Sequence, residues 1–389
     1  MWSCRSSSDR AAKILFAHGR GLGSVMSEST QAAAFINSLS VNGLRNLRNI
    51  RWQPGAGINV VHGSNGAGKT SLLEAIYLLG RPRSFRGGQM RDVCERGNAS
   101  FSVFSELTSG SRKRRLGVGF ESGEIQRRLD GESVSAGEAA RLFPVIVFEP
   151  GMHGWLEESP DYRRALLDWY LFHVEPSFLG LWQRYRRILR QRNAALRNAS
   201  QEAFLWDEAL VEHSCQLDAL RSRSLAAISE SFKAETALLA PGLTDVVPVY
   251  KPGAEDSPPT LMDKLRQVRD RELQMKSTQV GCHRFDWRFD DTQGSLRRRA
   301  SRGQQKLLLL AMVLTQAKSI KICSGLAPVL LLDDFSSELD RDHQRRAFQS
   351  MHGLRGQVFL STLDPEALES SWLDSADVFH VEHGKLMQS

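Results

Sequence analysis

The chain has 389 residues, of which 41% are hydrophobic and 24% charged, and its formal net charge is +7. This length and hydrophobic fraction predict one packed body with a sizeable second lobe. The longest apolar runs, near residues 307–314 and 329–332, are shorter than the roughly eighteen residues of a membrane span, which argues against an integral membrane subunit. The excess of Lys and Arg favours a polyanionic partner. Five scattered cysteines without a C-x-x-C pair fit a reducing cytoplasm rather than a disulfide framework or a zinc site.

The first 25 residues are rich in Ser and Arg and lack the apolar run of a secretory signal. We therefore predict that residues 1–34 are a disordered or artefactual extension and that translation begins at Met26. A transit-like leader is the alternative.

Short β-type runs dominate the next part of the chain. The first three are at residues 35–41, 49–53 and 58–61, with turn signals at Asn42-Gly43 and Pro54-Gly55. Residues 69–79 have the apolar spacing of a helix with one buried face. Further runs predict an added antiparallel layer and one buried strand, at residues 101–107, 115–121, 125–129 and 145–148.

From residue 161 to about 239 the composition changes to Leu, Ala, Arg and Glu, which indicates long helices. A strand at 246–250 and a helix at 261–275 follow, and then α/β alternation returns. Its elements are expected at residues 303–317, 329–332, 341–354, 357–361 and 378–382. We predict an α/β P-loop ABC-type ATPase head with an added antiparallel β-layer and an inserted helical lobe. The predicted divisions are 35–155 for the first head lobe, 156–275 for the helical lobe and 276–389 for the rest of the head.

A glycine-rich stretch joins the third run to the first helix and matches the phosphate-loop pattern at every position. Its residues are Gly63, Ser64, Asn65, Gly66, Ala67, Gly68, Lys69 and Thr70. In such a loop, backbone N–H groups and a helix N-terminus surround the phosphates, while Lys69 adds a charge and Thr70 offers its hydroxyl to Mg²⁺. The predicted cofactors are ATP and Mg²⁺, with Ser71 and Arg45 as further nucleotide contacts.

Two later motifs complete this prediction. The apolar strand at 329–332 ends in Asp333, a ligand for Mg²⁺, and Asp334, which together with Lys69 is a candidate catalytic residue. Ser337 and Asp340 follow as a D-loop. Asp334 is shorter than glutamate and holds an attacking water less well, so we expect slow hydrolysis. The signature residues are Ser301, Arg302, Gly303 and Gln304, which in ABC-type ATPases cap the γ-phosphate across a dimer.

Arginine and lysine are clustered at four places, which raises the expectation of nucleic-acid binding. The clusters are at residues 81–91, 112–115, 184–192 and 297–299. The candidate DNA contacts are Arg112, Lys113, Arg114, Arg184 and Arg187.

With these motifs placed, the chain from about residue 35 onward resembles the RecF family, the SMC/Rad50-related ATPases of bacterial recombinational repair. The segments that carry the resemblance, in order, are Arg45-Asn46, Glu74-Ala75-Ile76-Tyr77, Arg83-Ser84-Phe85-Arg86, Tyr162-Arg163-Arg164, Leu167-Asp168-Trp169, Gln191-Arg192-Asn193-Ala194-Ala195-Leu196-Arg197, Ser301-Arg302-Gly303-Gln304, Asp333-Asp334 and Ser337-Glu338-Leu339-Asp340. The switch histidine of ABC-type ATPases is missing after residue 361, so Thr362 or Asp364 would have to orient the γ-phosphate.

The resemblance implies an ATP-dependent homodimer that binds duplex and gapped DNA in the cytoplasm. It implies RecO and RecR as partners, recombinase loading, a role in the SOS response, and weak DNA-stimulated ATP hydrolysis as a release switch. Two alternatives remain from the residues alone. One is the ATPase subunit of a transporter, and the other is a decayed ATPase that acts only as a binding module.

Overall fold

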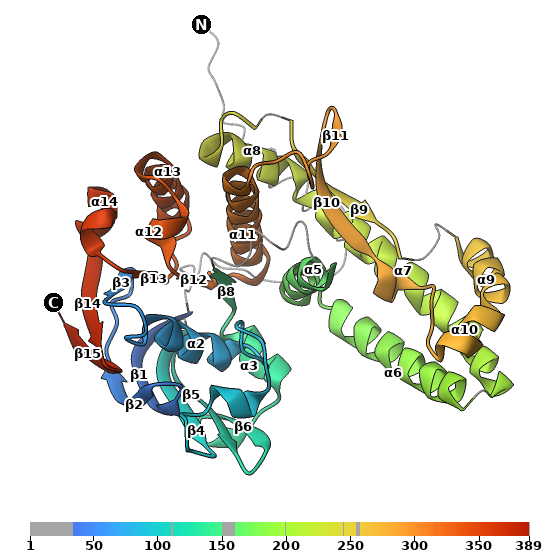
Figure 1. Cartoon of the computed structure of the whole chain (residues 1–389), viewed down its shortest axis with the longest axis horizontal. Coiled ribbons are helices and arrows are strands. Elements are labelled where there is room, and N and C mark those ends of the chain that lie inside the picture. The colour runs from blue at the N-terminus through green and yellow to red at the C-terminus, as the bar shows by residue number, and fades with distance from the viewer. Residues whose placement is uncertain are drawn as a thin grey trace, which may run out of the picture.

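The computed structural model describes residues 34–109, 112–149, 160–198, 200–243, 245–253 and 257–388. The expectations for residues 1–33, including a start at Met26, fall outside this described part. Figure 1 shows a head, built from two sheets and the helices around them, and an elongated helical arm that runs away from it with α9 and α10 at its far end.

The central sheet of the head has the strand order β15-β14-β3-β13-β12-β8. All neighbouring pairs are parallel except β14 with β15. Every residue of β12 and β8 is buried, as expected for parallel strands covered on both faces. The strands are β3 (Ile58–His62), β8 (Val145–Phe148), β12 (Val329–Leu332), β13 (Val358–Thr362), β14 (Ala376–Glu382) and β15 (Lys385–Gln388).

The second sheet is antiparallel, with the order β2-β1-β4-β5-β6-β7. Its inner residues alternate with polar ones and pack on helix α2 (Lys69–Gly80), which lies between the two sheets. The predicted added β-layer is present. Its strands are β1 (Ala34–Leu44), β2 (Leu47–Trp52), β4 (Phe101–Ser109), β5 (Arg112–Glu121), β6 (Glu124–Leu129) and β7 (Glu132–Ser133), and helix α3 (Ala136–Leu142) follows them.

The first hairpin turn is not where the Asn42-Gly43 signal placed it. Leu44 pairs with Leu47, so the two-residue turn is Arg45-Asn46, and Arg45 has a left-handed φ of 54°. Asn42 instead pairs with Asn49 inside the strands. Glycine is needed at position 43 because the backbone at Ser100 comes close to it, and a Cβ there would lie 2.9 Å from the Ser100 carbonyl oxygen.

The arm is mainly helical, as predicted, with a small sheet in the order β11-β10-β9. The single helix expected at 261–275 is two helices that meet at Val268. β9 and β10 pair across the predicted division at residue 275, and the domain limits stay predictions. The elements are α5 (Pro160–Val174), α6 (Phe178–Arg197), α7 (Asp207–Ala227), α8 (Ser229–Leu239), β9 (Val247–Lys251), α9 (Pro258–Gln267), α10 (Arg269–Met275), β10 (Asp286–Asp291) and β11 (Gly294–Ser295).

One arginine of the cluster at 184–192 has a structural role. Arg192 of α6 is fully buried and forms ion pairs of 2.9 Å with Asp207 and 2.7 Å with Glu272. These pairs tie α6 to α7 and α10. Arg192 is therefore unavailable to a nucleic acid, although its cluster was predicted from charge alone.

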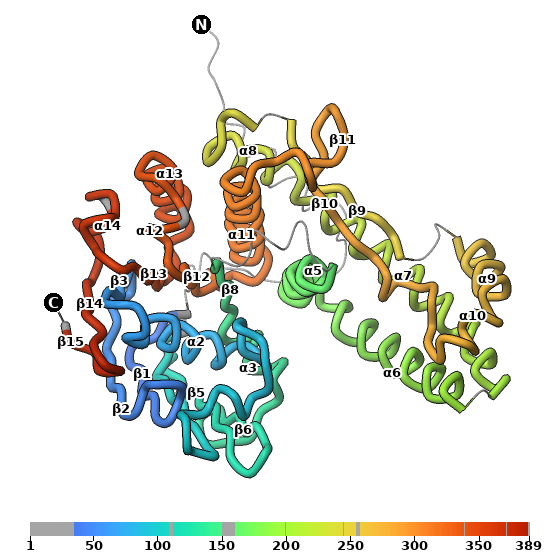
Figure 2. The backbone as a smooth tube through the Cα atoms, viewed as in Figure 1, coloured from blue at the N-terminus to red at the C-terminus, as the bar shows by residue number. Residues whose placement is uncertain are grey.

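Helix α11 (Arg302–Ser324) crosses the head and is longer than the predicted 303–317. Among the described residues it is the one helix long and apolar enough to span a membrane, but 72% of that apolar stretch is buried inside the protein. The tube in Figure 2 shows the blue β3 beside the red β13 and β14. The remaining helices are α12 (Phe335–Glu338), α13 (Arg341–His352) and α14 (Ser370–Leu373), with short 3-10 helices at Met90–Val93, Gln201–Trp206, Cys282–Arg284 and Pro365–Ala367.

Candidate nucleotide-binding site

The phosphate loop runs from the end of β3 to the start of α2, as predicted. Gly63 has a φ of 146°, and a Cβ there would lie 2.2 Å from the carbonyl oxygen of Val381, so only glycine fits. Gly68 precedes the first turn of α2 with a φ of 123°. The free N–H groups of that turn therefore face the loop, which is the arrangement that binds phosphate.

Lys69 is 7% exposed and holds the loop in shape. Its Nζ donates to the carbonyl oxygens of Gly63 at 2.7 Å and Ser64 at 3.1 Å. Burial lowers the pKa of the Lys69 ammonium, and the nearby Asp334 and Asp333 oppose that shift. The ammonium thus lies between the loop and two carboxylates, where it can contact a phosphate.

Asp333, directly after β12, accepts hydrogen bonds from side chains of β13 and α2. Its Oδ1 accepts from the Thr70 hydroxyl at 3.0 Å and from the Ser361 hydroxyl at 2.6 Å. Burial raises the pKa of the Asp333 carboxyl, and these hydrogen bonds oppose the rise. One carboxylate and one hydroxyl side by side beside a phosphate loop fit Mg²⁺, which takes few protein ligands and binds phosphate oxygens and water.

Asp334 begins the turn after β12 in a left-handed conformation, with φ 49°. Its backbone N–H donates to Ser361 Oγ at 2.8 Å, so the same serine fixes both aspartates. Its Oδ1 is buried and has no hydrogen-bond partner in the described part of the chain. A buried carboxylate oxygen with spare acceptor capacity suits the positioning of a water molecule.

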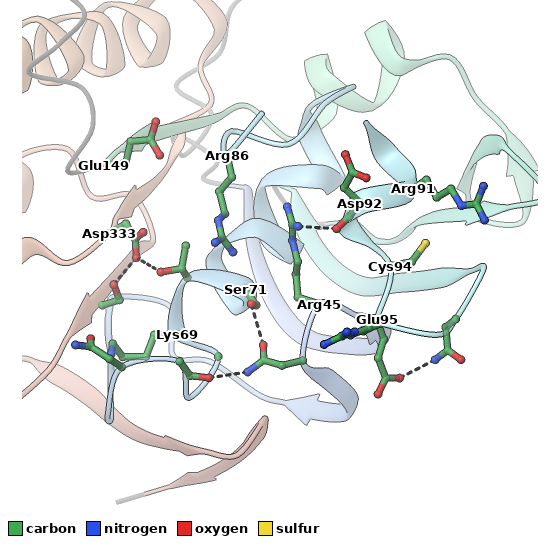
Figure 3. A pocket seen from close by; sticks show the side chains of 18 of the residues that line it. Arg45, Lys69, Ser71, Arg86, Arg91, Asp92, Cys94, Glu95, Glu149 and Asp333 are labelled. Atoms are coloured by element: carbon green, nitrogen blue, oxygen red, sulfur yellow. Dashed lines mark hydrogen bonds between the residues drawn. The ribbon is translucent and has the colours of Figure 1, made fainter. Parts of the chain in front are cut away.

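Glu149 is a site residue that the sequence analysis missed. Figure 3 shows it on the same side of the cavity as Asp333 and Lys69, with Asp333 between the two. Burial raises the pKa of the Glu149 carboxyl to about 7, Asp333 adds to the rise, and Arg86 opposes it. Its position directly after β8, which pairs with β12, is the signal that could have identified it, since the ends of parallel strands meet at one edge.

The β1–β2 hairpin forms the next wall of the cavity. Asn46 donates to the Gly66 carbonyl at 2.9 Å and accepts from the Ser71 hydroxyl at 2.9 Å, so it clamps the phosphate loop. Arg45 donates to the buried Glu74 of α2 through Nε at 2.9 Å and Nη2 at 2.8 Å. Arg45 and Ser71 therefore line the cavity, and their contact with nucleotide stays a prediction, while Asn46 was not expected to act there.

Arg86 is the second arginine of this wall. Its Nη1 lies 3.9 Å from Oε2 of Glu74. The Ser84 hydroxyl, two residues earlier, donates to Oε1 of the same glutamate at 2.5 Å. In Figure 3 its guanidinium lies between Arg45 and the carboxylates of Glu149 and Asp333. The cavity, of about 1110 Å³, continues past Arg91, Cys94 and Glu95 and is large enough for a nucleoside triphosphate.

The signature residues lie elsewhere on the head. Ser301 caps α11, accepting from the Gln304 N–H at 3.2 Å, while Gln304 accepts from the Ser301 N–H at 2.9 Å. Ser301, Gly303 and Gln304 line a separate cavity of about 480 Å³, which Asp340 also lines. None of the four signature residues lines the phosphate-loop cavity.

The two D-loop residues have local roles. Ser337 donates to the Asp334 carbonyl at 2.8 Å, and Asp340 caps α13 by accepting from the His343 N–H at 2.9 Å. At the end of β13, the Thr362 hydroxyl donates to the Asp364 carbonyl at 2.9 Å. The hydroxyls of Thr362 and Ser336 are also hydrogen-bonded to each other at 2.6 Å.

The candidate DNA contacts fall on two separate surfaces. Arg112, Lys113 and Arg114 are on β5 of the head, and Arg114 is ion-paired with Asp130. Arg184 and Arg187 are exposed residues of α6. Figure 1 shows α6 in the arm.

Comparisons with known proteins place this site in a family. A family model described as the RecF/RecN/SMC N-terminal domain matches residues 35–386. The "DNA replication and repair protein RecF" of Stenotrophomonas maltophilia (strain R551-3) is 37% identical over 361 residues, which cover 90% of this chain and 99% of that protein. The protein of the same name from Pseudomonas aeruginosa (strain LESB58) is 37% identical over 364 residues, covering 91% and 98%. This chain belongs to the RecF family.

Solved structures agree on the RecF fold. The recombination mediator protein RecF with ATP in the RecFOR pathway superposes with a TM-score of 0.83 at 24% identity, covering 94% of this chain and all of that one. An Smc head bound to the C-terminal winged-helix domain of ScpA gives 0.56 at 15% identity, covering 91% and 97%. The predicted ATPase-head fold is confirmed. The names of the RecF relatives favour a replication and repair protein over a transporter subunit.

Proposed function

We propose that this RecF-family chain binds ATP and Mg²⁺ at the phosphate loop, that ATP joins two copies of the chain, and that the joined heads bind duplex and gapped DNA in recombinational repair. Hydrolysis then releases the DNA. By the same family argument, RecR and RecO are its partners and the cytoplasm is its location. Support comes from relatives that are named as DNA replication and repair proteins and that align with nearly the whole chain.

The distance between the phosphate loop and the signature residues within one chain is the observation that supports a dimer. The phosphate loop and the signature residues line different cavities of one chain. A Cβ at Gly303 would have nothing within 4 Å, so the turn at the start of α11 is open to an incoming group. We infer that a second copy brings its Ser301, Arg302, Gly303 and Gln304 over the γ-phosphate of the first.

The residues of the cavity would divide the chemistry between them. The N–H groups of the loop and the Lys69 ammonium bind the phosphates, while Thr70 and Asp333 would hold Mg²⁺, which neutralises phosphate charge. Asp334 orients the attacking water through its Oδ1, which has no hydrogen-bond partner among the described residues. Arg45 and Arg86, both anchored near Glu74, are placed to contact phosphate oxygens from the opposite wall.

Arg112, Lys113 and Arg114 on the head and Arg184 and Arg187 on the arm are the proposed DNA contacts. If they bind phosphates, log affinity should fall by about 0.9 per contact for each tenfold rise in salt. An affinity that does not change with salt concentration would show that these residues are not the DNA-binding surface.

The experiment is light scattering of the full chain with ATP, with ADP and without nucleotide, each with and without duplex DNA. We expect a dimer only with ATP. Ser301→Arg should abolish this dimer and spare nucleotide binding, whereas Lys69→Ala should weaken nucleotide binding itself. Ser222→Arg, at an exposed position of α7, is the matched control.

A Ser301→Arg protein that still dimerises with ATP would overturn the two-chain site. Phosphate release with and without duplex DNA separates the remaining alternatives. A decayed ATPase releases none, and a repair switch releases phosphate slowly and faster with DNA.

A further inference from the structure

The outer face of the antiparallel sheet, opposite α2, is open. The strands β1, β2, β4, β5 and β6 each turn alternate side chains to this face, and those side chains are partly or fully exposed. A groove of about 820 Å³ crosses it, lined by residues that include Phe104, Lys113, Gly117, Gly119 and Arg128.

One row of residues runs straight across this face. Strand pairing places them in the order Arg51, Ser40, Phe104, Gly117 and Arg128. The single aromatic ring, Phe104, is 43% exposed at the centre of the row. Because neighbouring strands are about 4.8 Å apart, each arginine begins about 10 Å from the aromatic residue.

Gly117 and Gly119 keep the floor beside Phe104 low. Neither has a positive φ, and a Cβ would meet nothing closer than 3.7 Å at Gly117 or 3.5 Å at Gly119. The backbone therefore does not require glycine at either position. Glycine inside a strand lowers stability, and it often marks a place where a ligand comes close to the sheet.

The adjacent row carries side chains that can read the edge of a base. Its order is Asn49, Asn42, Ser102, Gly119 and Gln126. All of these but the glycine are exposed, and in the described part of the chain none of the four side chains has a hydrogen-bond partner. Amide groups donate and accept, which matches the mixed edges of nucleobases.

The charges beside Phe104 are mainly positive, and the carboxylates of Glu121 and Glu124 lie further along the same face, beyond the row of amides. Arg51, Lys113 and Arg128 form no ion pair with any described carboxylate, whereas Arg115 is paired with Glu106 at 3.4 Å and Arg114 with Asp130. These three cations, which have no ion pair within the described ranges, lie near one exposed ring and a row of amides. Together they give the elements of phosphate contact, base stacking and base-edge contact.

We propose that this face binds a single strand of nucleic acid, with a base stacked on Phe104 and phosphates on Arg51, Lys113 and Arg128. A single strand is the occupant that fits because the bases of a duplex are already stacked on one another and cannot offer a face to the ring. The site is separate from the ATP cavity, and it works without nucleotide.

The test uses the full chain without nucleotide and a fluorescent oligothymidylate of about 16 nucleotides, read by anisotropy. Phe104→Ala should weaken binding about 5- to 150-fold, the range of one lost stacking contact. Phe104→Trp should bind as well as the parent. Met387→Ala, which removes a 46% exposed side chain from a strand of the other sheet, is the matched control and should change nothing.

Gly117→Val tests the low floor. A β-branched residue favours the strand, so thermal stability should be kept or raised while oligothymidylate binding falls. Arg51→Gln and Arg128→Gln should each lower the slope of log affinity against log salt by about 0.7. Lys69→Ala, which removes the ATP site, should leave oligothymidylate binding unchanged, so failure of the ATP proposal and failure of this one are distinguishable.

Two outcomes would overturn the proposal. One is a Phe104→Ala protein that binds oligothymidylate as the Met387→Ala protein does, which would leave the face to a protein partner or to none. The other is loss of duplex binding with single-strand binding intact, which would make the face a duplex surface.

Discussion

Replacing Glu74 with Gln would test the contact that joins the first hairpin to the phosphate-loop helix. Glu74 is fully buried and accepts from Arg45 at 2.9 and 2.8 Å and from Ser84 at 2.5 Å. Removing one partner of a buried ion pair costs about 3–5 kcal/mol. The Arg45 side chain is 22% exposed and can turn partly to water, so we expect a loss of about 2–3 kcal/mol.

For a chain of this size such a loss lowers the melting temperature by roughly 2–4 °C. The measurement is thermal unfolding of the parent, Glu74→Gln and Asp342→Asn. Asp342 pairs with Arg345 at 3.0 Å on the surface, where an ion pair contributes about 0–1 kcal/mol. If Glu74→Gln had the same melting temperature as the Asp342→Asn control, the contact with Glu74 would not stabilise the packing of the hairpin on α2. The anchoring of Arg45 and Arg86 would then need another explanation.

Three further outcomes follow from the described contacts. Nucleotide affinity should rise as the pH falls from 8 to 6, because the Glu149 carboxyl, with its pKa raised to about 7, then loses its negative charge beside the phosphates. Titration calorimetry of Glu149→Gln should show a weaker pH dependence than the parent, and equal dependence would assign the effect to another group. Asp334→Asn should slow phosphate release about 100-fold or more while keeping ATP bound, and release at the parent rate would exclude Asp334 as the water-positioning residue. Arg192→Met should lower the free energy of unfolding by about 3–5 kcal/mol in urea, because it leaves Asp207 and Glu272 buried together; a loss below about 1 kcal/mol would contradict that role.

The phosphate loop was predictable because all its parts are contiguous. The spacing of Gly63, Gly68 and Lys69 fixes a strand, a tight turn and a helix start within one short segment. The buried strand before Asp333 was predictable for the same reason. The strand order, by contrast, pairs segments hundreds of residues apart, which periodicity alone does not specify.

Glu149 and Arg192 show why the rest could not be read in advance. Glu149 becomes a site residue only because β8 pairs with β12, a contact between distant segments. Arg192 was counted by charge with its exposed neighbours, yet its position on α6 turns it toward Asp207 and Glu272. The turn at Arg45-Asn46 was missed because a close approach at Gly43 and a turn favour the same residue type.

The placement of β3 between β13 and β14 bears on how the protein is made. A ribosome makes β3 and the phosphate loop first, whereas both strand neighbours of β3 lie about 300 residues later in the chain. Until β13 and β14 have been made, β3 has neither of its strand partners, and an unpaired apolar strand is prone to aggregation. A truncation before β13 would therefore remove both partners of the strand that leads into the phosphate loop.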